Sequence, residues 1–147
     1  MAHAVNELFT EGHRIDAIVP ASRTSAEVTT GWKSMRDFHK AFVLLLGGAL
    51  AANATVDVKI WQAKDDAGGS AKLVTGKSIT PLDSGDDNAL CGIELDTSEL
   101  DVTGEFDWIN VQILVGGAAA CLLAAALIRY QPRFKAVDYT NFTEIVN

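Results

Sequence analysis

The sequence predicts an all-β fold, a single-domain β-sandwich or jelly roll with extended terminal arms. Short apolar runs rich in β-branched residues recur along the 147 residues, and the clearest of them alternate apolar and polar side chains. Gly, Asp and Asn clusters separate these runs, and the three prolines lie at their boundaries, as expected for a residue that cannot join a central ladder. Eight or so strands at this spacing are typical of a sandwich.

The expected strands follow one another closely along the chain. Segment 54–63 alternates most regularly, so Val56, Val58 and Ile60 are predicted to face the core. Gly-rich and Asp-rich segments at 64–70 and 81–89 are predicted loops, Gly76 is a predicted bulge, and short helical turns are expected at 1–12 and 34–39. The remaining expected strands are 14–20, 26–32, 38–46, 72–80, 90–96 and 99–104, before a pair of strands within 106–130.

The stretch WINVQILVGGAAACLLAAALIRY, residues 108–130, is the most apolar part of the chain. Its uninterrupted apolar part has 16 residues, from Ile113 to Ile128, whereas a membrane-spanning helix needs about 20. The Gly116–Gly117 pair between two apolar runs favours a β-hairpin. Six alanines within 118–126 favour helix instead. We therefore expect a hairpin whose second strand is buried on both sides, with a short buried helix or a membrane span as alternatives.

Net charge and cysteine usage narrow the possible functions. The chain carries a formal charge of −7 with no cluster of Lys or Arg, which argues against nucleic-acid binding. The polar N-terminus lacks the pattern of a secretory signal peptide. Cys91 and Cys121 lie in apolar stretches without a CxxC motif, so buried thiols are expected more than a disulfide.

Motifs of catalysis and metal binding are not found. His3, His13 and His39 are not spaced as metal ligands, and the Asp-rich loop 83–88 lacks the spacing of a calcium loop. No nucleophile-elbow, Walker or dinucleotide-binding pattern occurs. We therefore expect no enzyme activity, no catalytic residues, no cofactor and no metal.

Aromatic and aliphatic side chains outside the expected core are candidates for contacts with a partner. Trp61 lies on the strand face opposite Val56, Val58 and Ile60, so it is predicted to face outward. Trp32 and Trp108 are expected in the core or at its rim. The terminal segments carry isolated apolar anchors separated by polar residues: Leu8, Phe9, Ile15, Phe134, Tyr139 and Phe142. These segments are predicted either to clamp a neighbour or to form ordinary edge strands and frayed ends.

Several motifs together resemble a known family. Trp32, Met35 and Phe38 open an apolar strand, GALAANATVD follows at 48–57, and QAKD with a Gly-rich turn follows at 62–65. KSITPL at 77–82, IELDTSELDVTGEF at 93–106 and RYQP at 129–132 continue the pattern. Over roughly 27–133 the chain is similar to small virion structural proteins of tailed phages and prophages. The alanine-rich 118–126 departs from relatives, in which the matching strand is β-branched.

The resemblance implies a non-enzymatic structural protein that binds the capsid exterior and stabilises it, as a cement or decoration protein. It implies the major capsid protein and further copies of the chain as partners, a trimer as the expected oligomer, and no nucleic acid or membrane. The expected location is the virion's capsid surface, after synthesis in the host bacterial cytoplasm. Residues 1–26 would be an arm with a short strand, 27–130 the sandwich, and 131–147 an arm or edge strand. Alternatives are a neck, tail or head-spike base component, or a carbohydrate-binding sandwich.

Overall fold

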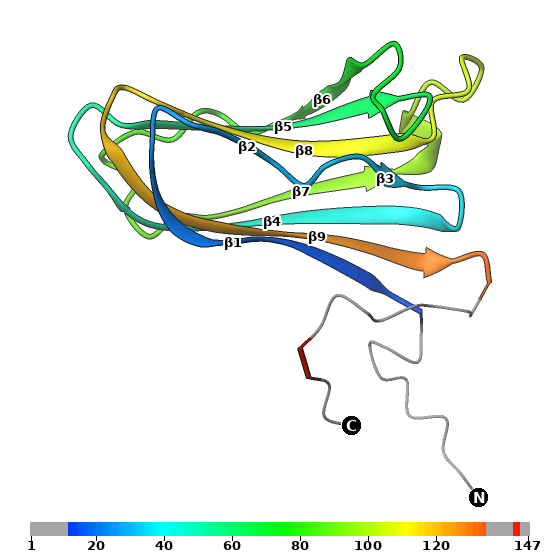
Figure 1. Ribbon diagram of the computed structural model, residues 1–147, viewed down its shortest axis with the longest axis horizontal. Helices are drawn as coiled ribbons and strands as arrows, with labels where there is room; N and C mark the ends of the chain where they lie inside the picture. The colour runs from blue at the N-terminus through cyan, green and yellow to red at the C-terminus, as the bar shows by residue number, and fades with distance from the viewer. Residues whose placement is uncertain (1–11, 135–142, 145–147) are drawn as a thin grey trace, which may run out of the picture.

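A computed structural model describes residues 12–134 and 143–144. These residues form nine strands and one short 3₁₀ helix, arranged as two stacked antiparallel sheets (Figure 1). The 3₁₀ helix η1 spans Thr97–Glu99. The strands are β1 (Arg14–Thr24), β2 (Glu27–Thr29), β3 (Lys33–Ser34), β4 (Phe38–Leu50), β5 (Thr55–Ala63), β6 (Lys72–Ser78), β7 (Leu90–Asp96), β8 (Trp108–Gly116) and β9 (Ala120–Pro132).

The strand order confirms the predicted all-β sandwich and selects the jelly roll. One sheet has the order β1-β9-β4-β7, and the other has the order β2-β8-β5-β6 with β3 also paired to β8. If β2 and β3 are counted as one interrupted strand, each sheet has four strands and successive strands mostly alternate between the sheets. This is the double Greek-key arrangement of an eight-stranded jelly roll.

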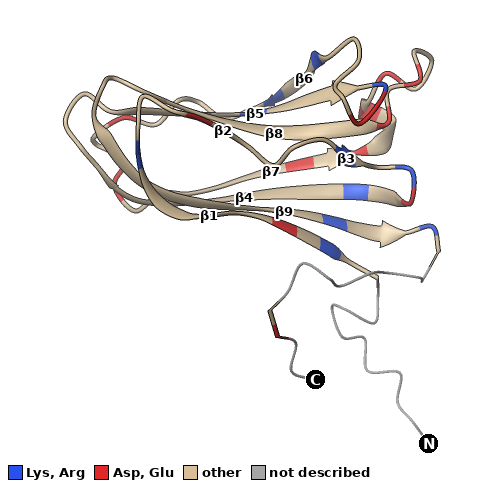
Figure 2. Cartoon of the chain, in the orientation of Figure 1, with Lys and Arg blue, Asp and Glu red and all other residues tan. Residues whose placement is uncertain are grey.

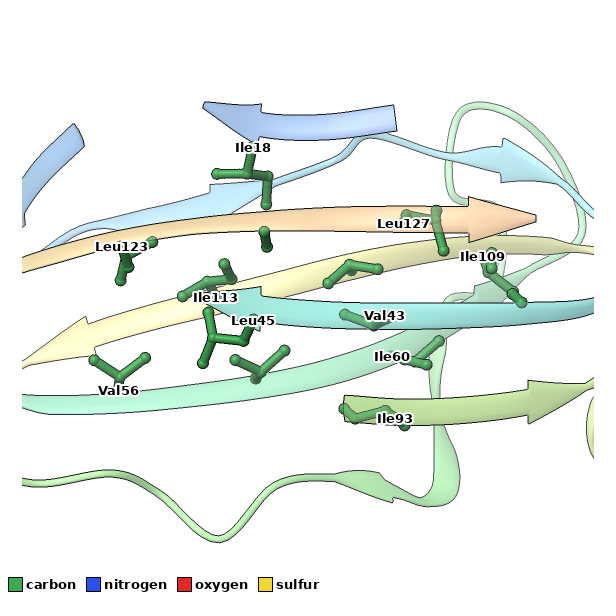
Figure 3. Close-up of a cluster of buried hydrophobic side chains, with 14 of the residues drawn as sticks. Ile18, Val43, Leu45, Val56, Ile60, Ile93, Ile109, Ile113, Leu123 and Leu127 are labelled. Atoms are coloured by element: carbon green, nitrogen blue, oxygen red, sulfur yellow. The ribbon is translucent and has the colours of Figure 1, made fainter. Parts of the chain in front are cut away.

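The core lies between the sheets and is made of alternate residues from both (Figure 3). Val56, Val58 and Ile60 of β5 are all buried, as their alternation predicted. From the opposite sheet, Val43 and Leu127 are equally buried. Such interdigitation of two inner faces is how a sandwich buries enough apolar area to be stable without metal or disulfide.

The apolar stretch 108–130 turns at its glycines but does not form a paired hairpin. β8 pairs with β2, β3 and β5, whereas β9 pairs with β1 and β4. The turn between them therefore crosses from one sheet to the other. Gly117 has φ of +80°, and a Cβ there would collide with the carbonyl oxygen of Asn53. The prediction of neighbouring paired strands was wrong, although the turn itself and both strands were predicted.

The prediction that β9 is buried on both faces was also wrong. Its side chains alternate between buried and partly exposed positions, and Leu122 is 49% exposed. Alanine content did not produce a helix, because β9 lies between β1 and β4 and is paired along both edges. No helix among the described residues is long and apolar enough to cross a membrane.

Three other expected features differ from the structure, and one agrees with it. Pro20 lies inside β1, not at its end, and coincides with a register shift between Ile18 and Ala21 on an outer strand of the sheet. Gly76 has φ of +74° beside a register irregularity in the β5–β6 pair, as predicted. Segment 99–104 is not a strand, because an Asp96–Glu99 capping box starts η1 and a turn follows. Segment 34–39 is not helical: Ser34 ends β3, residues 35–37 connect the two strands, and Phe38 begins β4.

Candidate interaction surface

The outward faces of the two sheets differ in chemistry. On the sheet that contains β5 and β8, polar side chains pair with one another: Lys59 Nζ lies 2.5 Å from Asp57 Oδ2. Trp61 Nε1 donates a hydrogen bond to Gln112 Oε1 at 2.8 Å on the same face. Such a polar outer face is what a solvated antiparallel sheet normally presents.

The outward face of the β1-β9-β4-β7 sheet carries a mainly apolar surface that reaches all four strands, with Ser22 beside Leu122 and Glu94 beside Phe42 as polar residues on it. Strand alternation and register place one set of residues on it, here called the apolar sheet face. Its most exposed members are Leu90 (70%), Val19 (65%), Leu122 (49%) and Leu46 (48%). The apolar sheet face consists of Ile15, Ala17, Val19, Phe42, Leu44, Leu46, Leu90, Gly92, Leu122, Ala124, Ala126 and Ile128.

Most charged residues of this sheet lie toward the end where β1 begins, and Arg23 of β1 lies toward the other end. Figure 2 shows β4 and β9 without Lys, Arg, Asp or Glu over most of their length. Lys40 is the one such residue of β4, and Arg129 is that of β9. Lys40 is opposite Tyr130, and Glu94 of β7 is opposite Phe42. The charges of β4 and β7 therefore border the apolar sheet face without crossing it.

Large and small side chains form adjacent rows on this face. On β4, Phe42, Leu44 and Leu46 make a row of large residues, and the register places Leu44 beside Ala126 and Leu46 beside Ala124 of β9. Two glycines allow large neighbours to lie flat: the Phe42 ring covers Gly92, and the Leu122 side chain covers Gly48. The large side chains of β4 thus form a raised row beside the small side chains in the middle of β9.

A buried ion pair lies between the two sheets beneath this face. Arg129 is 5% exposed, and its Nη2 donates to Asp16 Oδ2 at 2.8 Å. Its Nη1 donates to the Ser34 carbonyl oxygen at 2.8 Å, and Lys33 Nζ lies 3.4 Å from Asp16 Oδ1. Burial lowers the pKa of Arg129, and the Asp16 carboxylate opposes that shift. The cluster joins β1 and β9 of one sheet to β3 of the other.

An open hollow of about 630 Å³ lies at the end of the sandwich where β3 turns into β4. Met35, Leu100 and Phe106 supply its apolar lining, and Arg36 makes an ion pair with Asp107 at its wall. The nearby Lys72 ammonium lies 4.2 Å from the Phe106 ring centroid and 2.5 Å from Asp101 Oδ2. Arg36, which lines the hollow, and Lys72, which borders it, therefore each have an ion-pair partner. The geometry of these cations defines no catalytic arrangement.

The predicted interface residues do not gather in one place. Ile15 lies on β1 at the border of the apolar sheet face, and Trp61 is half-buried on the opposite sheet. Phe134, just beyond β9, is 72% exposed. Leu8, Phe9, Tyr139 and Phe142 lie outside the described residues. Residues 14–24, which belong to the predicted arm 1–26, form β1 at the edge of its sheet. This part of the segment therefore matches the alternative prediction of an ordinary edge strand.

The other predicted features can be placed as well. Cys91 and Cys121 are free thiols on β7 and β9, which lie on either side of β4. In the Asp-rich loop, Asp83 and Asp87 side chains accept hydrogen bonds from the backbone amides of Gly85 and Leu50. Within 12–134 and 143–144, no group of His, Cys, Asp or Glu has the arrangement of a metal site.

Sequence reasoning missed the apolar sheet face, although a signal for it was present. An antiparallel strand with one solvated face should carry polar residues at alternate positions. FVLLL in β4 and LLAAALI in β9 lack them. The second run predicts a strand buried on both sides, and the first lies within the expected strand 38–46. Two such strands side by side in one sheet indicate an apolar outer face.

Comparison with known proteins gives fold likeness only. No family model and no curated protein matches this chain. Among solved structures, the VP2 subviral particle of infectious bursal disease virus is 14% identical with a TM-score of 0.48, over 82% of this chain and 33% of that one. A structure of Desmodium yellow mottle tymovirus is 10% identical with a TM-score of 0.41, over 86% of this chain and 91% of that one.

A protein from Bacillus endospore appendages, described as disulfide-linked pili, is 14% identical with a TM-score of 0.44 over 89% of this chain and 96% of that one. This chain thus spans about a third of the VP2 chain and nearly the whole length of the other two. All of these likenesses concern the arrangement of strands, and none carries an argument about binding or assembly.

Proposed function

We propose that this chain is a non-enzymatic structural protein of a virion, a cement or decoration protein that binds the capsid exterior and stabilises it. The proposal is supported by the motifs that resemble phage structural proteins and by a jelly roll whose apolar sheet face is exposed in the part of the chain that the structure describes. The proposed partners are the major capsid protein and other copies of the chain. No chemistry is required, because the work of such a protein is the burial of surface.

The apolar sheet face is the observation that carries this proposal. Monomeric soluble proteins rarely expose contiguous apolar patches larger than a few hundred Å². Here the apolar sheet face crosses four strands and includes four large side chains that are each about half exposed or more: Val19, Leu46, Leu90 and Leu122. A protein that functions within an assembly has a physical reason to keep this surface, because assembly removes it from water.

The ends of the described sandwich support a second mode of contact. β1 begins and β9 ends at the same end of the molecule (Figure 1), and Arg14 is opposite Arg129 in the sheet. The chain therefore enters β1 and leaves β9 at neighbouring points of the sandwich. We propose that the segments before β1 and after β9 both act as arms on one neighbouring capsid subunit, with Phe134 at the start of the C-terminal one.

Reconstitution on particles tests the attachment. Particles depleted of the chain are mixed with full-length protein or with a variant lacking residues 1–11, a deletion that leaves β1 intact. We expect the full chain to bind and to raise the temperature at which the shell releases its contents. The shortened chain should fold normally by circular dichroism yet bind at least several-fold more weakly. Undiminished binding of the shortened chain would contradict the role of the N-terminal arm.

A neck, tail or head-spike base component is the alternative within the same class. It would use the same fold and the same burial of apolar surface, so the two differ only in position and number. Labelling of intact particles distinguishes them: a decoration protein is distributed over the whole shell, whereas a neck or tail component occupies one vertex or the tail.

A further inference from the structure

We propose that the apolar sheet face packs against the same face of a second copy of this chain, about a twofold axis parallel to the strands between β4 and β9. The partner is thus an identical protein, and the contact is a sheet-on-sheet interface. This arrangement differs from the trimer expected from the sequence. The proposal does not depend on the virion role, because the pair consists of two copies of the purified chain and no capsid protein.

The outer surface of this sheet has an area that suits such a pair. Its four strands have 11, 13, 13 and 7 residues, so at roughly 3.3 Å per residue and about 4.8 Å between strands the sheet covers about 700 Å². Two such sheets packed face to face, with the apolar sheet face at the centre, bury about 1,400 Å², which is within the range of stable specific interfaces. The face is more apolar than an average interface, and homodimer interfaces are the class with the most apolar composition.

The distribution of charged residues also favours this surface for contact between identical chains. Each copy carries a formal charge of −7, so two copies repel each other across most orientations. The outward face of the other sheet includes Glu27, Asp57 and Lys59, and a contact through that face would have to remove these charges from water. The apolar sheet face has no charged member, so pairing through it brings no carboxylates together at the centre.

The rows of large and small residues make the face complementary to itself. A twofold axis parallel to the strands and between β4 and β9 places β4 of one copy over β9 of the other. Leu44 and Leu46 of each copy then lie over the small residues of its partner, and Phe42 lies over Ile128. Each of these contacts occurs twice, as a twofold interface requires. Two sheets packed in this way keep their strands nearly aligned.

The sheet register predicts the contacts of this pair. Rotation about an axis parallel to the strands leaves positions along the strand unchanged. Since Leu44 is opposite Ala126 and Leu46 is opposite Ala124 within one sheet, Leu46 of one copy should contact Ala124 of the second copy. Leu44 should contact Ala126 in the same manner, on both sides of the axis.

The first test is the mass of the purified full-length chain and of two charge variants. Leu46→Glu places a carboxylate on the apolar sheet face, and Leu114→Glu places one on the outer face of the other sheet. Leu46 and Leu114 are exposed to similar degrees, 48% and 42%, so the variants are a matched pair. We expect the parent and Leu114→Glu to sediment as dimers at micromolar concentration, and Leu46→Glu to dimerise at least tenfold more weakly. A monomeric or trimeric parent, or equal weakening by both variants, would overturn the proposal.

A mixing experiment tests the register and guards against a variant that merely misfolds. Ala124→Lys should weaken self-association like Leu46→Glu, because each new lysine meets Leu46 of its partner. An equimolar mixture of the two variants should form a heterodimer, since the new carboxylate and the new ammonium face each other. Circular dichroism confirms that each variant is folded. Folded variants that remain monomeric when mixed would overturn the proposed axis.

Discussion

Arg129 on β9 donates a hydrogen bond at 2.8 Å to Asp16 on β1, and both residues are more than 90% buried. The two residues lie 113 positions apart in the sequence. With the Ser34 carbonyl as a third member, they connect both sheets at the end where β1 begins. The sandwich therefore contains a buried charge pair whose partners depend on each other.

Removal of one partner from this pair should be strongly destabilising. Asp16→Ala leaves the Arg129 guanidinium buried opposite an apolar side chain, and breaking such a pair costs about 3–5 kcal/mol. Arg36→Ala is the control, because the Arg36–Asp107 pair is largely exposed and such pairs contribute about 1 kcal/mol or less. Urea unfolding measures both. An Asp16→Ala cost as small as that of Arg36→Ala would contradict the importance of the buried pair.

The turn between β8 and β9 should tolerate no side chain at its second glycine. Gly117→Ala combines a positive φ with a collision against the Asn53 carbonyl oxygen, so we expect a loss of about 1–3 kcal/mol or more. Gly31→Ala is a matched control: Gly31 also has a positive φ, of +70°, but open space surrounds its Cβ position. Thermal unfolding should show the larger loss for Gly117→Ala, and equal losses would refute the steric argument.

The two thiols should react at different rates with a disulfide reagent. Burial raises the pKa of the Cys121 thiol, and its side chain is inaccessible in the native sandwich. Cys91 is only half-buried. At pH 8 we expect one thiol per native chain to react within minutes and the second only after unfolding in urea. Cys91→Ser should remove the fast reaction, and equal rates for both native thiols would contradict this placement.

Acid should destabilise the fold through carboxylates around η1. A hydrogen bond from the Asp96 backbone amide, followed by one from Lys77, lowers the pKa of Glu99, and a hydrogen bond from Lys72 lowers that of Asp101. Folded-state values below the unfolded ones add stability above about pH 4, and this stability is lost as the pH falls through the folded-state pKa. Chemical unfolding from pH 7 to 2 measures the slope, which should be shallower for Glu99→Gln. A slope unchanged by Glu99→Gln would contradict the role of this carboxylate.

Local patterns in the sequence were sufficient to predict most strands. The alternation of Val56, Val58 and Ile60 in β5 predicted the buried face correctly. Ile109 and Val111 in β8 are buried in the same alternating manner. One local signal was present but not used: Asp96 and Glu99 have the spacing of a capping box, which predicts a helical turn where a strand was expected.

Contacts between distant segments could not be predicted in this way. Whether β8 pairs with β9 or crosses to the other sheet depends on competition from β4 and β5, far away in the sequence. Asp16 interrupts the apolar pattern of the expected strand 14–20, and its burial is explained only by Arg129, which lies far away in the sequence. The apolar sheet face likewise emerges only when β4 and β9 are placed side by side.

The number of copies per particle tests the central claim most directly. Purified virions that contain this chain would be analysed on a quantified gel against the major capsid protein. A cement protein that covers the shell predicts hundreds of copies per particle, in a fixed ratio to the major capsid protein. About a dozen copies would contradict the decoration role and favour a neck or tail component, and complete absence from the particle would contradict the virion role itself.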